Sequence, residues 1–165
     1  MITMLYRICA LLLIMGVAAP TIANDSPEQP VRYNHRFHTE DMGFGCLDCH
    51  QNAESHEKAM IPNIEMCGTC HIDEEAENSE VRKVAEYVAS GTPIPWQEIH
   101  TVPDFVYFTH RRHVTLGKIE CQVCHGEVSE METPFISTAV NMDMEWCMKC
   151  HEQREVTNDC VSCHR

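Results

Sequence analysis

Leucine is nearly missing from this chain beyond its first 23 residues, where only Leu47 and Leu116 occur. Leucine is normally among the commonest residues of globular proteins. Burial of apolar surface in a densely packed interior is the dominant favourable contribution to folding. This region therefore cannot build an ordinary aliphatic core, and something other than leucine must supply the missing apolar volume.

Basic residues are also scarce. The 165 residues include 12 Lys and Arg against 25 Asp and Glu, which gives a formal net charge of −13 at pH 7. Nucleic-acid binding depends on cationic contacts with phosphates, so this composition argues against it. The charge instead favours protein partners with basic docking surfaces.

The apolar run near the N-terminus is too short for an ordinary membrane-spanning helix. It extends for 12 residues, from Ile8 to Ala19, whereas a spanning helix needs about 20. Arg7 precedes the run, and small residues around Ala23 provide a cleavage position. We therefore expect residues 1–23 to be a secretory signal peptide, with an uncleaved membrane anchor as the alternative.

What the chain does contain is the pattern Cys-x-x-Cys-His, five times. In chain order the motifs are Cys46/Cys49/His50, Cys67/Cys70/His71, Cys121/Cys124/His125, Cys147/Cys150/His151 and Cys160/Cys163/His164. This pattern is the attachment site of c-type haem, in which both cysteines form thioethers and the histidine is the proximal iron ligand. Paired cysteines also build zinc ribbons, but zinc gives no reason for a histidine after every second cysteine. The sequence therefore predicts five covalently bound c-type haems.

The use of cysteine agrees with this interpretation. Cys9 lies in the expected signal peptide, and the ten other cysteines all belong to the five motifs, which leaves none for disulfides. Five porphyrins can supply the apolar volume that leucine does not. No alternating run is long enough for a substantial sheet. We therefore expect a small, mainly α-helical multihaem cytochrome with extensive loops, a haem-packed core and few or no strands.

Two of the motifs follow a His-x-x-His pair at the same distance. The pairs are His35/His38 before Cys46 and His110/His113 before Cys121, with seven residues between pair and motif in both cases. An aromatic residue stands two positions before each pair, Tyr33 and Phe108. Low-spin electron-transfer haems need a second axial ligand, so these four histidines are predicted distal ligands.

The chain has enough histidines to supply a second axial ligand to every haem iron. Outside the five motifs there are six histidines: His35, His38, His56, His100, His110 and His113. We predict that His35, His38, His100, His110 and His113 are the distal ligands, with His56 and Met144 in reserve. A haem enzyme needs an iron position that its substrate can reach. Irons with both axial positions filled by protein ligands instead favour electron transfer without bond chemistry. The ligand count thus favours an electron-transfer protein, which is not itself an enzyme, over a multihaem reductase.

The motifs divide the chain after the signal peptide into three parts. Residues 24–72 form an N-terminal di-haem part, residues 73–102 a helix and a proline-rich connector, and residues 103–165 a C-terminal tri-haem part. The valine spacing predicts a helix from Glu74 to Ser90, opened by acidic residues and ended by Gly91. The prolines after it predict an extended connector.

The chain resembles the c3/c7 type of multihaem cytochrome. The resemblance rests on an aromatic-x-His-x-x-His stretch ahead of a haem motif, at Tyr33 to His50 and Phe108 to His125. A wider stretch is similar to the pentahaem cytochrome c subunit of alternative complex III and of related menaquinol-oxidising respiratory complexes. The matching runs are Ala59 to His71, Pro93 to Trp96, Ile99 to His100, Pro103 to Phe108 and Met144 to His151.

This resemblance implies a subunit on the periplasmic face that passes electrons along a haem wire in a quinol-oxidising complex. A periplasmic location also follows from the cofactor, because c-type haem is attached outside the cytoplasm. Membrane association would then come from partner subunits or from an uncleaved N-terminal segment. A free periplasmic shuttle of the c3/c7 kind is the alternative, and its partners would be other redox proteins.

Overall fold

Helical segments joined by long loops make up the part of the chain that the computed structural model describes, residues 28–164; the expected signal peptide lies outside the described residues. The segments are η1 (Phe37–Asp41), α1 (Cys46–Cys49), α2 (Ile64–Cys67), α3 (Ser79–Ser90), η2 (Arg112–Leu116), α4 (Gln122–His125), η3 (Val128–Glu130), α5 (Met144–Gln153) and α6 (Cys160–Cys163). Between residues 28 and 164 the strand-like pairing is limited to an isolated antiparallel bridge between Val106 and His164. The expected mainly α-helical fold with extensive loops is confirmed.

A single helical turn shapes the first and the last haem motif. In the motif of α1, the His50 N–H donates to the Cys46 carbonyl at 2.8 Å, and the His164 N–H donates to the Cys160 carbonyl of α6 at the same distance. Residues three and four apart lie on one face of a helix. One turn therefore directs both cysteines and the histidine to the same side, where a porphyrin can be attached.

Helix α3 begins later than the sequence predicts. It starts at Ser79 instead of Glu74, because the Asn78 side chain caps it by accepting a hydrogen bond from the Glu80 N–H at 2.8 Å. The acidic residues before Asn78 form turns instead of a first helical turn. The predicted end is right: Gly91 adopts a left-handed conformation, with φ of 63°, that glycine tolerates without strain.

Helices α2 and α3 pack against each other at one end of the molecule. Ile64 of α2 and Val84 and Ala85 of α3 are buried. Gly68, directly after α2, allows a close approach, since a Cβ atom built on it would lie only 3.0 Å from Val88 Cγ1. A larger residue at position 68 would push the two helices apart.

The side chains form very little core. The buried apolar residues are Val31, Ala53, Ile64, Val84 and Ala85, whereas many large apolar side chains are exposed, among them Phe37, Phe44, Leu116, Val123 and Val161. A folded chain with so much exposed apolar surface needs another partner to cover it. This agrees with the expected role of porphyrins as the bulk of the interior.

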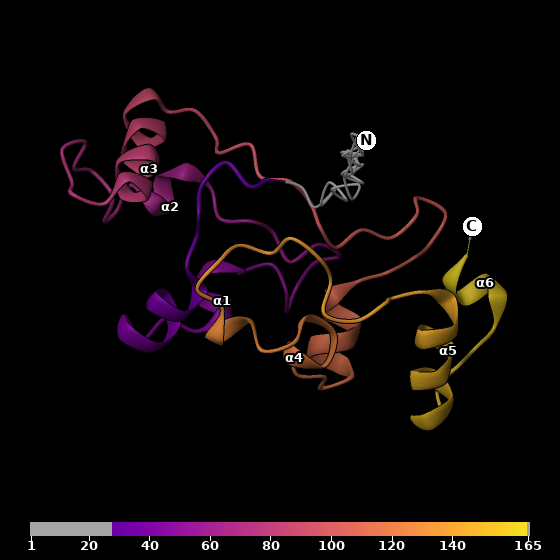
Figure 1. The fold of residues 1–165 in the computed structure, drawn as a ribbon. Helices are drawn as coiled ribbons and strands as arrows, with labels where there is room; N and C mark the ends of the chain where they lie inside the picture. The colour runs from indigo at the N-terminus through magenta and orange to yellow at the C-terminus, as the bar shows by residue number, and fades with distance from the viewer. Residues whose placement is uncertain (1–27, 165) are drawn as a thin grey trace, which may run out of the picture.

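The haem motifs are spread along the length of the molecule. Figure 1 shows α2 and α3 at one end, α1 and α4 in the middle, and α5 and α6 at the other end. The segment at 92–103 contains no helix and runs over the molecule as an extended connector, as its prolines predict. None of the helices within residues 28–164 has the length and apolar character needed to cross a membrane.

Candidate haem sites

Hydrogen bonds to backbone carbonyls orient two of the proximal histidines. His50 Nδ1 lies 2.6 Å from Met60 O, and His151 Nδ1 lies 2.8 Å from Thr157 O. An imidazole that donates from Nδ1 to a carbonyl keeps Nε2 unprotonated, which is the form that binds a metal. Both rings can therefore present Nε2 to a haem iron.

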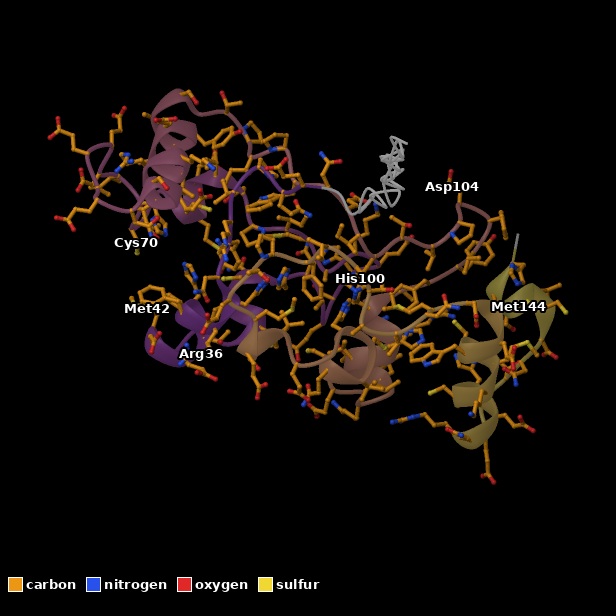
Figure 2. All side chains as sticks on the ribbon, in the orientation of Figure 1. Arg36, Met42, Cys70, His100, Asp104 and Met144 are labelled. Atoms are coloured by element: carbon orange, nitrogen blue, oxygen red, sulfur yellow. The ribbon has the colours of Figure 1, made fainter. Side chains whose placement is uncertain are left out.

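In the second motif, the side chain of Cys70 is exposed. Helix α2 ends at Cys67 and residues 68–70 form a turn, so Cys70 lies beyond the helix that carries its partner cysteine. The Cys70 N–H still donates to the Cys67 carbonyl at 3.2 Å, and its Sγ lies 3.7 Å from Thr69 Oγ1. Figure 2 shows Cys70 at the edge of the α2–α3 end of the molecule.

The physical reason for this exposure is that few side chains of the chain itself cover the haem-attachment faces. Three other motifs also have one exposed cysteine each, namely Cys46, Cys147 and Cys160. A thioether forms only where the porphyrin can reach the thiol, and an attached porphyrin would then cover it. Haem attachment at Cys70 stays a prediction.

Three of the five predicted distal histidines are oriented in the same way as His50 and His151. His38 Nδ1 lies 2.8 Å from the carbonyl of Asn34, and His113 Nδ1 lies 2.9 Å from the carbonyl of Thr109, four residues earlier in both copies of the repeat. His110 Nδ1 lies 2.8 Å from the carbonyl of Glu57. The sequence repeat is thus also a repeat in three dimensions.

Three of these distal imidazoles face a proximal imidazole. The ring centres are 6.1 Å apart for His38 and His71, 6.3 Å for His110 and His125, and 6.2 Å for His113 and His151. Two imidazoles on opposite sides of one iron place their ring centres about 6 Å apart, since each metal–nitrogen bond is about 2 Å long. The residues present therefore fit bis-histidine haems.

His35 lies near the first motif, and its buried Nδ1 has no hydrogen-bond partner within residues 28–164. It is more than half buried, and its pKa is lowered to about 4 by burial first, and then by the positive charges of His50 and His38. Its ring contacts Tyr33 edge-on at 4.7 Å and Phe135 at 5.9 Å. The structure thus places His35 close to His50, the proximal histidine of that motif.

Cysteines from different motifs lie near one another and show how the motifs are ordered in space. Burial is the main reason for the raised pKa values of Cys67, Cys121, Cys124 and Cys147, and a thiol of a neighbouring motif contributes to each. Those neighbours are Cys49 for Cys67, Cys46 for Cys121, Cys150 for Cys124 and Cys163 for Cys147.

These neighbouring thiols place the motifs in a linear series. The second motif (α2) neighbours the first (α1), the first neighbours the third (α4), the third neighbours the fourth (α5), and the fourth neighbours the fifth (α6). Figure 1 shows the same succession of helices from one end of the molecule to the other. Haems attached to these cysteines would follow one another in a row.

The protein family described as cytochrome c7 and related cytochrome c matches residues 31–86 and 106–165. The chain belongs to this family. It is also 31% identical, over 172 residues, to a protein of Nitratidesulfovibrio vulgaris (strain Hildenborough) named menaquinone reductase, multiheme cytochrome c subunit; the match covers 90% of this chain and 82% of that protein. This cytochrome is therefore a multihaem electron-transfer protein with covalently bound haems, and not itself an enzyme.

In this cytochrome, His100 lies against the central haem motif. Its ring meets His125 edge-on, with centres 4.6 Å apart, and meets Phe135 at 5.1 Å. Burial lowers its pKa, and its buried Nε2 has no hydrogen-bond partner. A spacing of 4.6 Å is too short for two imidazoles across one iron, where about 6 Å is needed. The role of His100 as a distal ligand stays a prediction.

The two reserve ligands are on the surface. The His56 ring is exposed and its Nδ1 lies 2.7 Å from the hydroxyl of the adjacent Ser55. Met144 is the first residue of α5 and is 64% exposed. Among residues 28–164 the structure brings together no group of three or more His, Cys, Asp or Glu side chains that could hold a free metal ion.

Phe105 is a neighbour of the last motif that the sequence patterns do not reveal. Its ring faces His164, with centres 5.9 Å apart and planes 29° from parallel. The Tyr107 N–H donates to the Cys163 carbonyl at 2.7 Å, so the segment that follows the connector is joined to α6 through the backbone. Backbone pairing between segments so far apart leaves no local signal in the sequence.

Proposed function

We propose that this cytochrome carries five haems in a row and relays electrons along them on the periplasmic side of a quinone-linked membrane complex. The observation that carries the proposal is the linear succession of the five motifs. Each motif neighbours the next in the series through a cysteine thiol. Electron transfer between cofactors needs them to be close together, and a row of haems meets this need.

Four of the five irons have an imidazole for each axial position in this proposal. His50, His71, His125, His151 and His164 are the proximal ligands, and His35, His38, His110 and His113 are the distal ligands of the first four in that order. Haems supply one-electron chemistry at these sites. The protein holds five of these imidazoles by hydrogen bonds at Nδ1, namely His38, His50, His110, His113 and His151. An iron with an imidazole on both sides has no position for a substrate.

The support for a quinone-linked complex comes from two similarities. The relative from Nitratidesulfovibrio vulgaris is named as a subunit of a menaquinone reductase, and the connector resembles that of pentahaem subunits in quinol-oxidising complexes. The two names imply opposite directions of electron flow. We propose a quinone-binding partner in the membrane, and the direction is one of the outcomes of the experiment.

A periplasmic location is the remaining part of the proposal. It is supported by the signal-like segment at 1–23 and by the cofactor, because c-type haem is attached outside the cytoplasm. The formal charge of −13 favours a partner with a basic surface, and attraction between the two would weaken as salt is added.

The test is purification of a tagged form from detergent-solubilised native membranes. Co-purification of a quinone-binding membrane subunit, with haems oxidised by added menaquinone or reduced by menaquinol, supports the proposal and shows the direction of flow. A soluble monomer found entirely in the periplasmic fraction would instead identify a free electron shuttle. A variant with the cysteines of one motif changed to alanine is the control for non-specific retention.

A further inference from the structure

In the fifth motif a phenyl ring faces the histidine, whereas an imidazole faces the histidine in three of the other motifs. His71, His125 and His151 each face an imidazole at 6.1–6.3 Å, whereas His164 faces Phe105 at 5.9 Å. The spacing is nearly the same, but a phenyl ring has no nitrogen that can bind iron. Phe105 therefore stands in a position comparable with that of a distal ligand and cannot act as one.

Backbone contacts hold the segment next to Phe105 against the fifth motif. Val106 forms an antiparallel bridge with His164 itself, and the Tyr107 N–H donates to the Cys163 carbonyl at 2.7 Å. The residues on the C-terminal side of Phe105 are thus joined directly to the motif that carries the iron. The backbone of this segment is thus fixed against the fifth motif, which keeps the Phe105 side chain within reach of His164.

His56 and His100, to which the proposed function assigns no iron, lie away from the fifth motif. His100 packs edge-on against His125 at 4.6 Å, and Figure 2 shows it in the middle of the molecule, well away from α6. The backbone carbonyl of His56 accepts hydrogen bonds from Thr109 and Arg111, which places it beside the second His-x-x-His pair. Both histidines are thus engaged with segments other than α6.

We propose that the haem held by Cys160, Cys163 and His164 has no imidazole opposite His164, and that its open axial position, beside Phe105, binds small neutral molecules such as carbon monoxide. This rests on the proposed function, which assigns a haem to the fifth motif. Phe105 is 56% exposed, so a small molecule can reach this end of the molecule from solvent. Its ring offers no hydrogen-bond donor to an anion, which favours neutral ligands.

The first experiment measures haem content and carbon monoxide binding in the same preparation of the complete haem-loaded protein. We expect five haems by mass spectrometry, one high-spin ferric signal by electron paramagnetic resonance, and carbon monoxide bound to one haem after reduction. A haem count other than five would contradict the proposed function. Five haems that are all low-spin and do not bind carbon monoxide would overturn this inference alone.

The second experiment places an imidazole opposite His164. Phe105→His should close the fifth iron, so that the high-spin signal and the bound carbon monoxide are both lost while the haem count stays at five. Val102→His, which adds an imidazole three residues earlier in the chain, is the matched control and should leave both signals unchanged. If Phe105→His also leaves them unchanged, the open position is not beside Phe105.

Two further variants exclude other ligands. Met144 lies at the start of α5, near α6 in Figure 2; if it closed the fifth iron, Met144→Leu would create the high-spin signal instead of leaving it unchanged. His100→Ala tests in the same way whether His100 is the distal ligand of the fifth iron. The appearance of a first high-spin haem in either variant, with none in the natural protein, would overturn the inference.

Discussion

The phenol ring of Tyr33 stacks on the imidazole of His38, with ring centres 4.6 Å apart and planes within 18° of parallel. The second copy of the repeat has the same arrangement, in which Phe108 stacks on His113 at 4.7 Å and 25°. In both copies the aromatic ring also meets the first histidine of the pair edge-on. One aromatic residue thus fixes the ring planes of two predicted iron ligands.

Replacement of Tyr33 should disturb the haem that His38 serves. Tyr33→Leu removes three aromatic contacts, with His35, His38 and Trp96, of about 0.5–1.5 kcal/mol each, so the melting temperature should fall. Release of the His38 ring should also shift the low-spin resonance of one haem, which a merely structural residue would not do. Tyr33→Phe keeps the ring and is the control. An unchanged resonance in Tyr33→Leu would show that the aromatic ring does not set the ligand plane.

Removal of a facing distal imidazole should open one iron. His110→Ala deletes the ring that is parallel to His125 within 6°, so one more haem should become high-spin and bind carbon monoxide. His56→Ala is the matched control, because its exposed ring is hydrogen-bonded to the adjacent Ser55 and the backbone contacts of residue 56 remain. New high-spin haem in His56→Ala, with none in His110→Ala, would reverse the ligand assignment.

The close approach of α2 and α3 can be tested at Gly68. Gly68→Val places side-chain atoms where Val88 Cγ1 already lies 3.0 Å from a Cβ position, and we expect a loss of about 1–3 kcal/mol of stability. Combination with Val88→Ala should restore part of this loss, as residues in contact are energetically coupled. Thermal unfolding measures both effects. Gly45→Val is the control, since its Cβ position is 3.6 Å from the nearest atom, Asp48 Oδ2; equal losses at both sites would contradict the packing argument.

Glu80 should make the attachment of the N-terminal segment to α3 dependent on pH. The pKa of Glu80 is lowered, first by the backbone N–H of Arg32, which donates to Oε2 at 2.6 Å, and then by Lys83. A carboxylate with a lowered folded-state pKa adds stability above its unfolded value of about 4, and this is lost as the pH falls through the folded value.

Glu80→Gln should therefore lower stability by less than about 1 kcal/mol at pH 7, as expected for an exposed charged contact, and should remove that part of the acid sensitivity. Glu77→Gln, which removes the same charge just before α3, is the control. The check is thermal unfolding between about pH 3 and pH 7, which spans the range where the carboxylate titrates. An equal response in both variants would mean that net charge, and not the contact with Arg32, is responsible.

Much of the candidate site could be predicted because haem attachment is a local property. Five consecutive residues carry the two thioethers and the proximal ligand, so the motif is complete within its own segment. The His-x-x-His pairs were also predictable, since a duplicated spacing from a haem motif is visible without the fold. The start of α3 was predicted wrongly because a single capping residue, Asn78, outweighed the acidic residues before it.

The sequence by itself thus determined the five Cys-x-x-Cys-His motifs, the histidines predicted to be proximal ligands and the scarcity of side-chain core. Only the tertiary structure decided that the second motif lies beyond the first with Cys70 exposed, that His100 packs on His125, and that Phe105 faces His164. The physical reason is that these relationships depend on how distant segments meet, for example through the Arg36 N–H and the Met131 carbonyl at 3.0 Å. Almost any residue can form backbone hydrogen bonds of this kind, so no residue pattern predicts them.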